Sequence, residues 1–150
     1  SANFYSAIKA PAGFPMDPNK WTVEFNDANN RTQATPTQNT WYNLASALLS
    51  IPIGAWNVEY QVNLYNDTAG KEAEAALSTA NNSRSDADLN ARVIGVTGNV
   101  STSVYRRKAI TLASKTTYYL NVRTQNAGVG NILTLGGDGS TIIRAVSAYL

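Results

Sequence analysis

The chain has 150 residues, of which 43% are hydrophobic and 15% are charged, and its formal net charge is +2. This length predicts one domain with a core of its own, and the small net charge gives no support for a nucleic-acid partner. The sequence contains no cysteine and no histidine, which excludes disulfide bonds, thiolate zinc sites, cysteine nucleophiles and an imidazole base.

The first twenty residues contain Pro11, Pro15 and Pro18 and follow no periodic pattern. They predict an irregular lead-in from an upstream region over residues 1–20, followed by one domain over residues 21–150. The first residue is not methionine, so we expect the C-terminal piece of a longer protein. No apolar run reaches the length of a transmembrane helix, so we expect no membrane insertion.

Short apolar stretches separated by turn residues follow along the rest of the chain, and most of them predict strands. Residues 31–40 are a loop or an edge strand, because Pro36 interrupts them. Residues 71–80 have a helix-like composition, but alternation of small apolar residues favours a strand. The predicted strands are 21–25, about 40–45, 55–65, 71–80, two within 91–112, 116–125, 131–135 and 140–150.

The segment "AWNVEYQVNLY" at residues 55–65 alternates between two kinds of side chain. A period of two predicts a strand with one face in a core and one polar face. The apolar side carries Trp56, Val58, Tyr60, Val62 and Leu64, and the polar side carries Asn57, Glu59, Gln61 and Asn63.

Eight to ten short strands at spacings of about 8–12 residues, with no long helical segment, predict an all-β protein. Such a pattern is typical of an antiparallel β-sandwich or barrel. No repeat period is visible, which argues against a propeller or a β-helix.

The last strand, "STIIRAVSAYL", is apolar on both faces, and Arg144 interrupts only one of them. A strand in an antiparallel sandwich normally has only one covered face. We therefore expect a second cover, which is a loop, another domain or a neighbouring subunit. For the last case, the residues assigned to the interface are Ile143, Ala145, Ser147 and Tyr149, with Asn57 and Glu59 at the same seam.

Three stretches resemble the complement-globular-head and tumour-necrosis-factor jelly rolls. "SIPIGAWNVEYQVNLY" is similar to the Pro- and Gly-containing turn and aromatic-rich strand of that family, "KAITLASKTTYYLNVRT" to its pair of later strands, and the C-terminal strand to its last one. The resemblance implies a jelly roll that forms homotrimers with the C-terminal strand near the threefold axis. The chain departs from the family in lacking a collagen-like stalk and disulfides.

Abundant Asn, Ser and Thr without cysteine also resemble the C-terminal head domains of bacteriophage tail fibres and tailspikes. That resemblance implies a virion protein, extracellular at its point of action, that trimerises at the fibre tip. It would bind a polysaccharide or an outer-membrane receptor on the bacterial surface. The alternatives are a monomeric carbohydrate-binding module appended to a hydrolase and a purely structural trimerisation cap.

Aromatic and basic residues on two of the predicted strands are candidates for ligand binding. If those strands pair, their rings and guanidinium groups would form a shelf for a sugar ring and an acidic glycan. The alternative is a solvated face with cross-strand pairs, and core packing for the tryptophan. The candidates are Tyr105, Arg107, Tyr119, Arg123 and Trp41.

Metal and catalytic sites have little support in the sequence. Asp86 and Asp88 are oxygen ligands of the kind that Ca²⁺ prefers, but further acidic positions are missing and turn chemistry explains both. A glycosidase needs two facing carboxylates, and no spacing among Glu24, Asp27 and Glu59 requires such a pair. We expect no cofactor, no metal and no enzymatic activity in this chain.

Overall fold

The computed structural model describes residues 21–95 and 100–148, so the predicted lead-in and Tyr149 lie outside the described residues. The described part contains ten strands and one turn of 3₁₀ helix. In chain order they are β1 (Thr22–Asp27), β2 (Asn30–Ala34), β3 (Tyr42–Ile51), β4 (Gly54–Asn66), β5 (Glu72–Ser78), β6 (Asn90–Ile94), β7 (Thr102–Leu112), β8 (Thr116–Arg123), β9 (Asn131–Leu135), η1 (Gly136–Asp138) and β10 (Thr141–Ser147).

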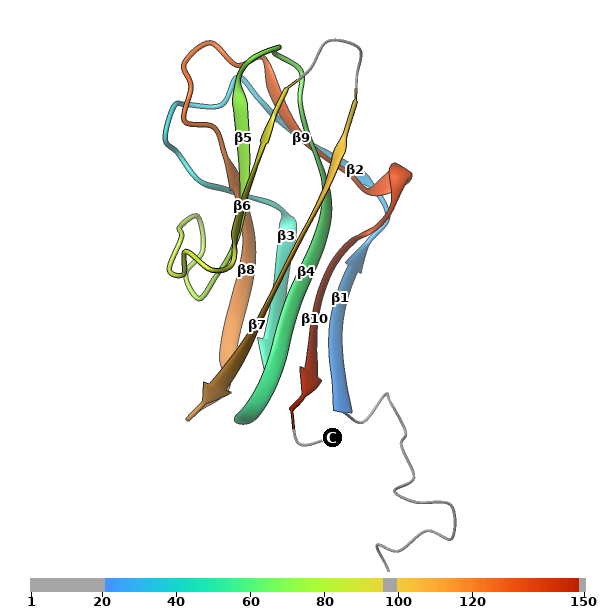
Figure 1. Cartoon of the computed structure of the whole chain (residues 1–150), viewed down its shortest axis with the longest axis vertical. Helices are drawn as coiled ribbons and strands as arrows, with labels where there is room; N and C mark the ends of the chain where they lie inside the picture. The colour runs from blue at the N-terminus through green and yellow to red at the C-terminus, as the bar shows by residue number, and fades with distance from the viewer. Residues whose placement is uncertain (1–20, 96–99, 149–150) are drawn as a thin grey trace, which may run out of the picture.

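The strands form two antiparallel sheets that pack face to face (Figure 1). The first sheet has six strands in the order β1-β10-β4-β9-β2, and β7 pairs with β4. The second sheet has the order β3-β8-β5-β6. This arrangement confirms the predicted antiparallel β-sandwich of jelly-roll type.

Apolar side chains from alternate positions of both sheets fill the space between them. Val58 and Tyr60 of β4 are fully buried, and so is Leu77 of β5. The Tyr60 hydroxyl donates a hydrogen bond to the carbonyl oxygen of Ala75 over 3.0 Å, which joins the two sheets through the core. Burial leaves this phenol with a raised pKa. The predicted alternation of β4 and the strand at 71–80 are therefore confirmed.

β10 lies between β1 and β4 in the first sheet. The face that was predicted to meet another chain points instead into the core. Ile143 and Ala145 are fully buried in the core of their own chain, and Ser147 is also buried. Ile143 and Ala145 have no surface left for a second chain, and Ser147 has only a small one, so the predicted interface through this face of β10 was wrong. The outward residues of β10 are instead Ile142, Arg144 and Val146, all partly exposed.

Two other predicted boundaries shift for local reasons. β3 runs to Ile51 rather than ending near residue 45, because a register shift follows Asn43 and the strand then resumes. Ala45 and Ser46, inside this irregularity, both have positive φ angles. The stretch predicted as a loop or an edge strand contains β2, which pairs only with β9 at the end of the first sheet.

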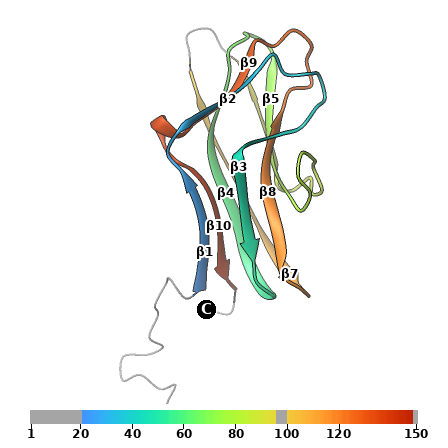
Figure 2. The same cartoon turned by 180° about the vertical axis from the view of Figure 1, so that it is seen from behind.

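The outer faces of the two sheets differ in how the chain covers them. On the second sheet, the loop between β5 and β6 covers Asn121, whose side chain is fully buried. The Asn121 amide donates hydrogen bonds to the carbonyl oxygens of Ala80 and Ser83 in this loop. The segment between β2 and β3 crosses to this sheet as well (Figure 2). On the first sheet, outward side chains of β10 and of the lower part of β4 stay partly exposed.

β1 begins and β10 ends at the same end of the sandwich, since Thr22 pairs with Val146 (Figure 1). In the described residues, no helix is long and apolar enough to cross a membrane.

One acidic group ties the turn between β1 and β2 together. The carboxylate of Asp27 accepts hydrogen bonds from Nε of Arg31 at 2.9 Å and from the backbone of Asn29 at 3.1 Å. Mainly through Arg31, these bonds lower the pKa of Asp27 to about 2. A carboxyl group with a depressed folded-state pKa stabilises the fold above its unfolded pKa and loses that contribution as the pH falls through its folded pKa.

We expect Asp27→Asn to lower the free energy of unfolding by about 1–2 kcal/mol at pH 7. The loss is kept this small because solvent screens the partly exposed Arg31. The difference from wild type should shrink as the pH falls from about 4 toward 2. Urea denaturation across this range measures it, with the exposed Asp138→Asn as the control. A difference that stays constant with pH would contradict the assignment.

Candidate functional site

The four residues predicted to form one shelf lie on different sheets. Tyr105 and Arg107 are on β7 in the first sheet, whereas Tyr119 and Arg123 are on β8 in the second. β7 and β8 follow one another in the chain but do not pair, so the expected single shelf does not form. The structure instead places Arg123 beside Trp41, and Tyr105 and Arg107 beside Glu59.

Trp41 lies immediately before β3, next to the end of β8. Tyr42 pairs with Val122, and both turn toward the core, so Trp41 and Arg123 are neighbours on the outer face of the second sheet. The guanidinium carbon of Arg123 is 4.6 Å from the centre of the Trp41 ring. This is cation–π geometry, and it holds the partly exposed indole in one orientation.

Arg123 is itself held by the carboxylate of Glu74 on β5, whose side chain is 0% exposed. Glu74 also pairs with Arg92 of β6 and accepts a hydrogen bond from Nε2 of Gln125 at 2.8 Å. A buried carboxylate is tolerated where cations and donors occupy both of its oxygens. We name Trp41, Glu74, Arg92, Arg123 and Gln125 the Trp41 cluster.

Sequence reasoning found Trp41 and Arg123 but missed Glu74 and Arg92. The available signal was the alternation of β5: Ala73, Ala75 and Leu77 face the core, which puts Glu74 on the outer face. An acidic residue at the centre of a strand with basic residues on neighbouring strands predicts such a cross-strand pair.

Tyr119 lies on the same outer face as Arg123, but apart from it. Asn121 stands between them in β8, and the loop between β5 and β6 covers it. Tyr119 is half-buried. The Trp41 cluster and Tyr119 are thus separate features of this face.

The outer face of the first sheet carries a line of alternating charge. Glu24 is opposite Arg144, which is opposite Glu59, which is opposite Arg107. Nε of Arg144 is 2.6 Å from Oε2 of Glu24, and its Nη1 is 3.4 Å from Oε1 of Glu59. We name these four residues the charged row.

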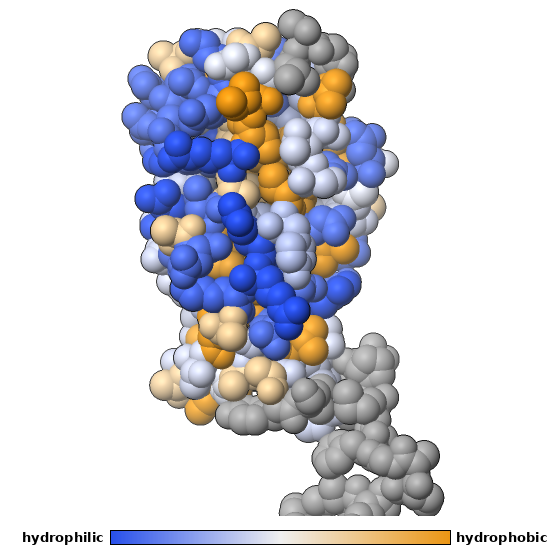
Figure 3. Space-filling model, viewed as in Figure 1, coloured by the Kyte–Doolittle hydropathy of each residue, from blue (hydrophilic) through white to orange (hydrophobic). Residues whose placement is uncertain are grey.

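Tyr105 completes the surroundings of Glu59. Its hydroxyl donates a hydrogen bond to Oε2 of Glu59 over 2.7 Å, and this bond raises the pKa of the Tyr105 phenol. Asn57 and Glu59, which were expected at a seam between chains or in solvent, both face outward here. The middle of the side over which β7 runs is largely hydrophilic, and hydrophobic residues lie in its upper part and at its lower end (Figure 3).

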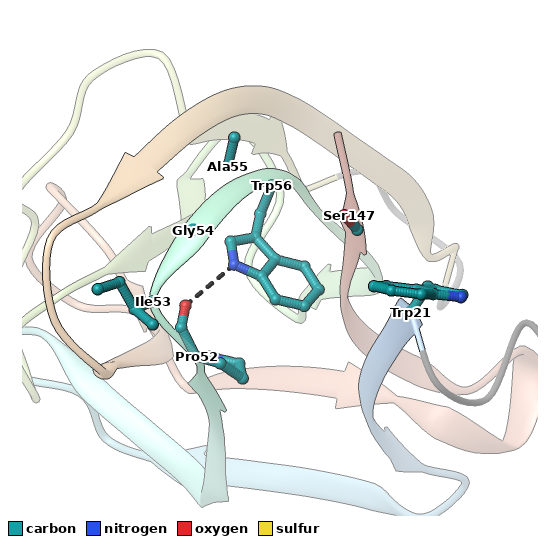
Figure 4. Close-up of a pocket in the computed structure, with 7 residues that line it drawn as sticks. All are labelled: Trp21, Pro52, Ile53, Gly54, Ala55, Trp56 and Ser147. Atoms are coloured by element: carbon teal, nitrogen blue, oxygen red, sulfur yellow. Dashed lines mark hydrogen bonds between the residues drawn. The ribbon is translucent and has the colours of Figure 1, made fainter. Parts of the chain in front are cut away.

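A pocket of about 280 Å³ lies at the end of the sandwich where β3 turns into β4. The indole of Trp56 forms one wall and Trp21 another, with Ser147 between them (Figure 4). Nε1 of Trp56 donates a hydrogen bond to the carbonyl oxygen of Pro52 at 2.9 Å. This bond satisfies the N–H group of the Trp56 indole, so the surface that Trp56 presents to the pocket is apolar.

Asp86 and Asp88, weighed as calcium ligands, bind Lys108 of β7. Its Nζ lies 2.5 Å from Oδ2 of Asp86 and 2.8 Å from Oδ2 of Asp88. Hydrogen bonds to the two carboxylates raise the pKa of Lys108. In the part of the chain that the structure describes, no group of three or more acidic, histidine or cysteine residues is placed to hold a metal ion.

No protein family model and no curated protein matches this chain. Among solved structures, that of infectious bursal disease virus strain Gx matches with a TM-score of 0.51, 11% identity and coverage of 85% of this chain and 32% of that chain. The VP2 subviral particle of the same virus matches with a TM-score of 0.47 and 12% identity, and the match covers 83% of this chain and 37% of that chain. Eiger TNF from S. frugiperda matches with a TM-score of 0.46 and 16% identity, and the match covers 85% of this chain and 91% of that chain.

The chain spans about a third of the length of the viral chains that it matches. At these identities the likeness shows the fold alone, which is the jelly roll.

The burial of Glu74 makes a direct test of the Trp41 cluster possible. We expect Glu74→Gln to lower the free energy of unfolding by about 3–5 kcal/mol, because it leaves Arg123 and Arg92 without their buried counter-charge. Urea denaturation measures the loss. The matched control is Glu72→Gln: Glu72 is 32% exposed and 3.7 Å from Arg92, so its loss should cost less than about 1 kcal/mol. Equal losses would contradict the special position of Glu74.

Proposed function

We propose that the chain is the receptor-binding head of a phage tail fibre or tailspike, and that it binds bacterial surface carbohydrate as a homotrimer. The observation that carries the proposal is the position of Trp41. Its indole is partly exposed on the outer face of a rigid sheet, and an arginine anchored by a fully buried carboxylate holds it in place.

An immobilised indole suits a sugar ring for two physical reasons. The apolar C–H face of a pyranose packs against an aromatic ring, while nearby amides hydrogen-bond to its hydroxyls. A ring that is already fixed loses little conformational entropy on binding. Two amides surround the acid of the Trp41 cluster: Nε2 of Gln125 donates to Glu74 at 2.8 Å, and Nε2 of Gln38 donates to the carbonyl oxygen of Gln125 at 2.9 Å.

The charge of the Trp41 cluster favours a neutral sugar over the acidic glycan that isolated arginines would select. The carboxylate of Glu74 forms ion pairs with both Arg123 and Arg92, and a carboxylate oxygen of Glu72 lies 3.7 Å from the guanidinium group of Arg92. Two carboxylates therefore offset two guanidinium groups. With no net positive charge at the site, an anionic ligand gains little there.

Self-association is supported by the contrast between the two outer faces. The chain's own loops bury the centre of the second sheet, whereas Ile142 and Val146 of the first sheet stay partly exposed beside the charged row. Three weak sites on one rigid particle raise avidity on a repetitive cell surface without any tight single site.

A monomeric carbohydrate-binding module is the second candidate. It is favoured by the complete core: Ile143 and Ala145 are fully buried within one chain, so β10 needs no partner to cover them. Both candidates use the Trp41 cluster and differ in the solution mass. A purely structural cap has no ligand, and a glycan array distinguishes it from both.

We expect Trp41→Ala to abolish binding on a glycan array, because it removes the platform while leaving the core intact. Ile53→Ala is the control: it removes an exposed apolar side chain from the end of the sandwich and should leave binding unchanged. Circular dichroism checks that both variants fold. Retained binding by Trp41→Ala, or equal loss in both variants, would contradict the assignment to Trp41.

We expect the wild-type particle to have three times the chain mass of 16.1 kDa in light scattering. Val146→Arg should reduce this mass, since it puts a long charged side chain on the outer face of the first sheet directly beside Thr22 of the edge strand β1. Asn81→Arg, in the exposed loop over the second sheet, is the control and should keep the trimer. A wild-type protein with the mass of one chain would favour the monomeric module.

A further inference from the structure

The charged row has a direction across the first sheet. Its members come from four strands, and each is directly opposite the next in the register of the sheet. The signs run negative, positive, negative, positive from Glu24 on β1 to Arg107 on β7. β1 and β7 are the two edges of this part of the sheet. The row therefore ends in opposite charges at opposite edges.

Among residues 21–95 and 100–148, no acidic side chain forms an ion pair with Arg107, the positive end of the row. Glu59 is the acid opposite Arg107, but its Oε2 accepts the hydroxyl of Tyr105 and its Oε1 faces Arg144. Arg107 is exposed, and among the described residues it makes no hydrogen bond or ion pair. At the other end, the side chain of Glu24 is 33% exposed, and Arg144 contacts its Oε2.

We propose that copies of the chain associate head to tail, with β7 of one copy beside β1 of the next, and that Arg107 pairs with Glu24 of the neighbouring copy. The inference rests on the proposed self-association and identifies its contact. Each junction continues the alternation of the row, so a ring of three joins three rows into one closed belt of alternating charge.

The same charges disfavour the other ways in which two edges can meet. Two β7 edges would bring together Arg106 and Arg107 of both copies, and like charges in contact repel. A contact between different edges is heterologous, and such contacts form closed rings when the rotation permits it. The edges of β1 and β7, which no other described strand pairs, are thereby covered, and covering edges is how sheet proteins avoid uncontrolled edge pairing.

A double-mutant cycle tests the pair in the full-length chain. Arg107→Gln and Glu24→Gln are each expected to weaken assembly at least tenfold, as measured by sedimentation equilibrium over a range of protein concentrations. The double variant is expected to be no weaker than the weaker single variant, because residues that act through one contact are not additive. Arg84→Gln removes an exposed arginine from the loop over the second sheet and should leave assembly unchanged.

Added salt should weaken the wild-type assembly more than that of the double variant, since screening acts on the ion pair. Additive losses in the double variant, or full assembly in both single variants, would overturn the Arg107–Glu24 contact while leaving self-association in place. A wild-type chain that sediments as a monomer at every concentration would overturn both. Circular dichroism establishes that each variant retains its fold.

Discussion

The alternation of β4 is the constraint on which the rest of the structure depends. This strand pairs with β7 along one side and with β10 and then β9 along the other, so its orientation sets that of the whole first sheet. Val58, Tyr60 and Val62 are fully buried against the second sheet. A shift of one residue would exchange the two faces and put these side chains into water. The outward position of Glu59, and with it the charged row, is thus a consequence of core packing.

The two outer faces show different uses of charge. On the second sheet, the fully buried carboxylate of Glu74 pairs with Arg123 and with the more exposed Arg92, and desolvation makes an unpaired carboxylate costly there. On the first sheet, Arg144 joins Glu24 and Glu59 at partly exposed positions, where each pair contributes little to stability. Charges of the first kind fix a local geometry, and charges of the second kind remain available to a partner.

Strand periodicity predicts most of the fold, because one buried face leaves a clear mark on the sequence. It places β4 well and identifies β5 as a strand despite its alanine-rich composition. It fails for β10, whose two faces are both apolar enough to be core. Only the neighbouring strands β1 and β4 decide that Ile143 and Ala145 turn inward.

The candidate sites were harder to predict, because they depend on which strands pair. β7 and β8 are separated by only three residues, which favours a hairpin, yet the chain passes from one sheet to the other between them. Trp41 and Arg123 are 82 positions apart and become neighbours only through the pairing of β3 with β8. Glu74 joins them through the pairing of β5 with β8. Local pattern carries no information on such long-range partners.

The separation of the two features bears on how they would work together. The Trp41 cluster lies on the outer face of the second sheet, and the charged row lies on the outer face of the first. The core of the sandwich stands between them, so an assembly built on the first sheet leaves the indole uncovered. In the proposed ring, three such indoles would belong to one particle. Binding at one copy then holds the other two near the same surface, which is the condition under which weak sites gain avidity.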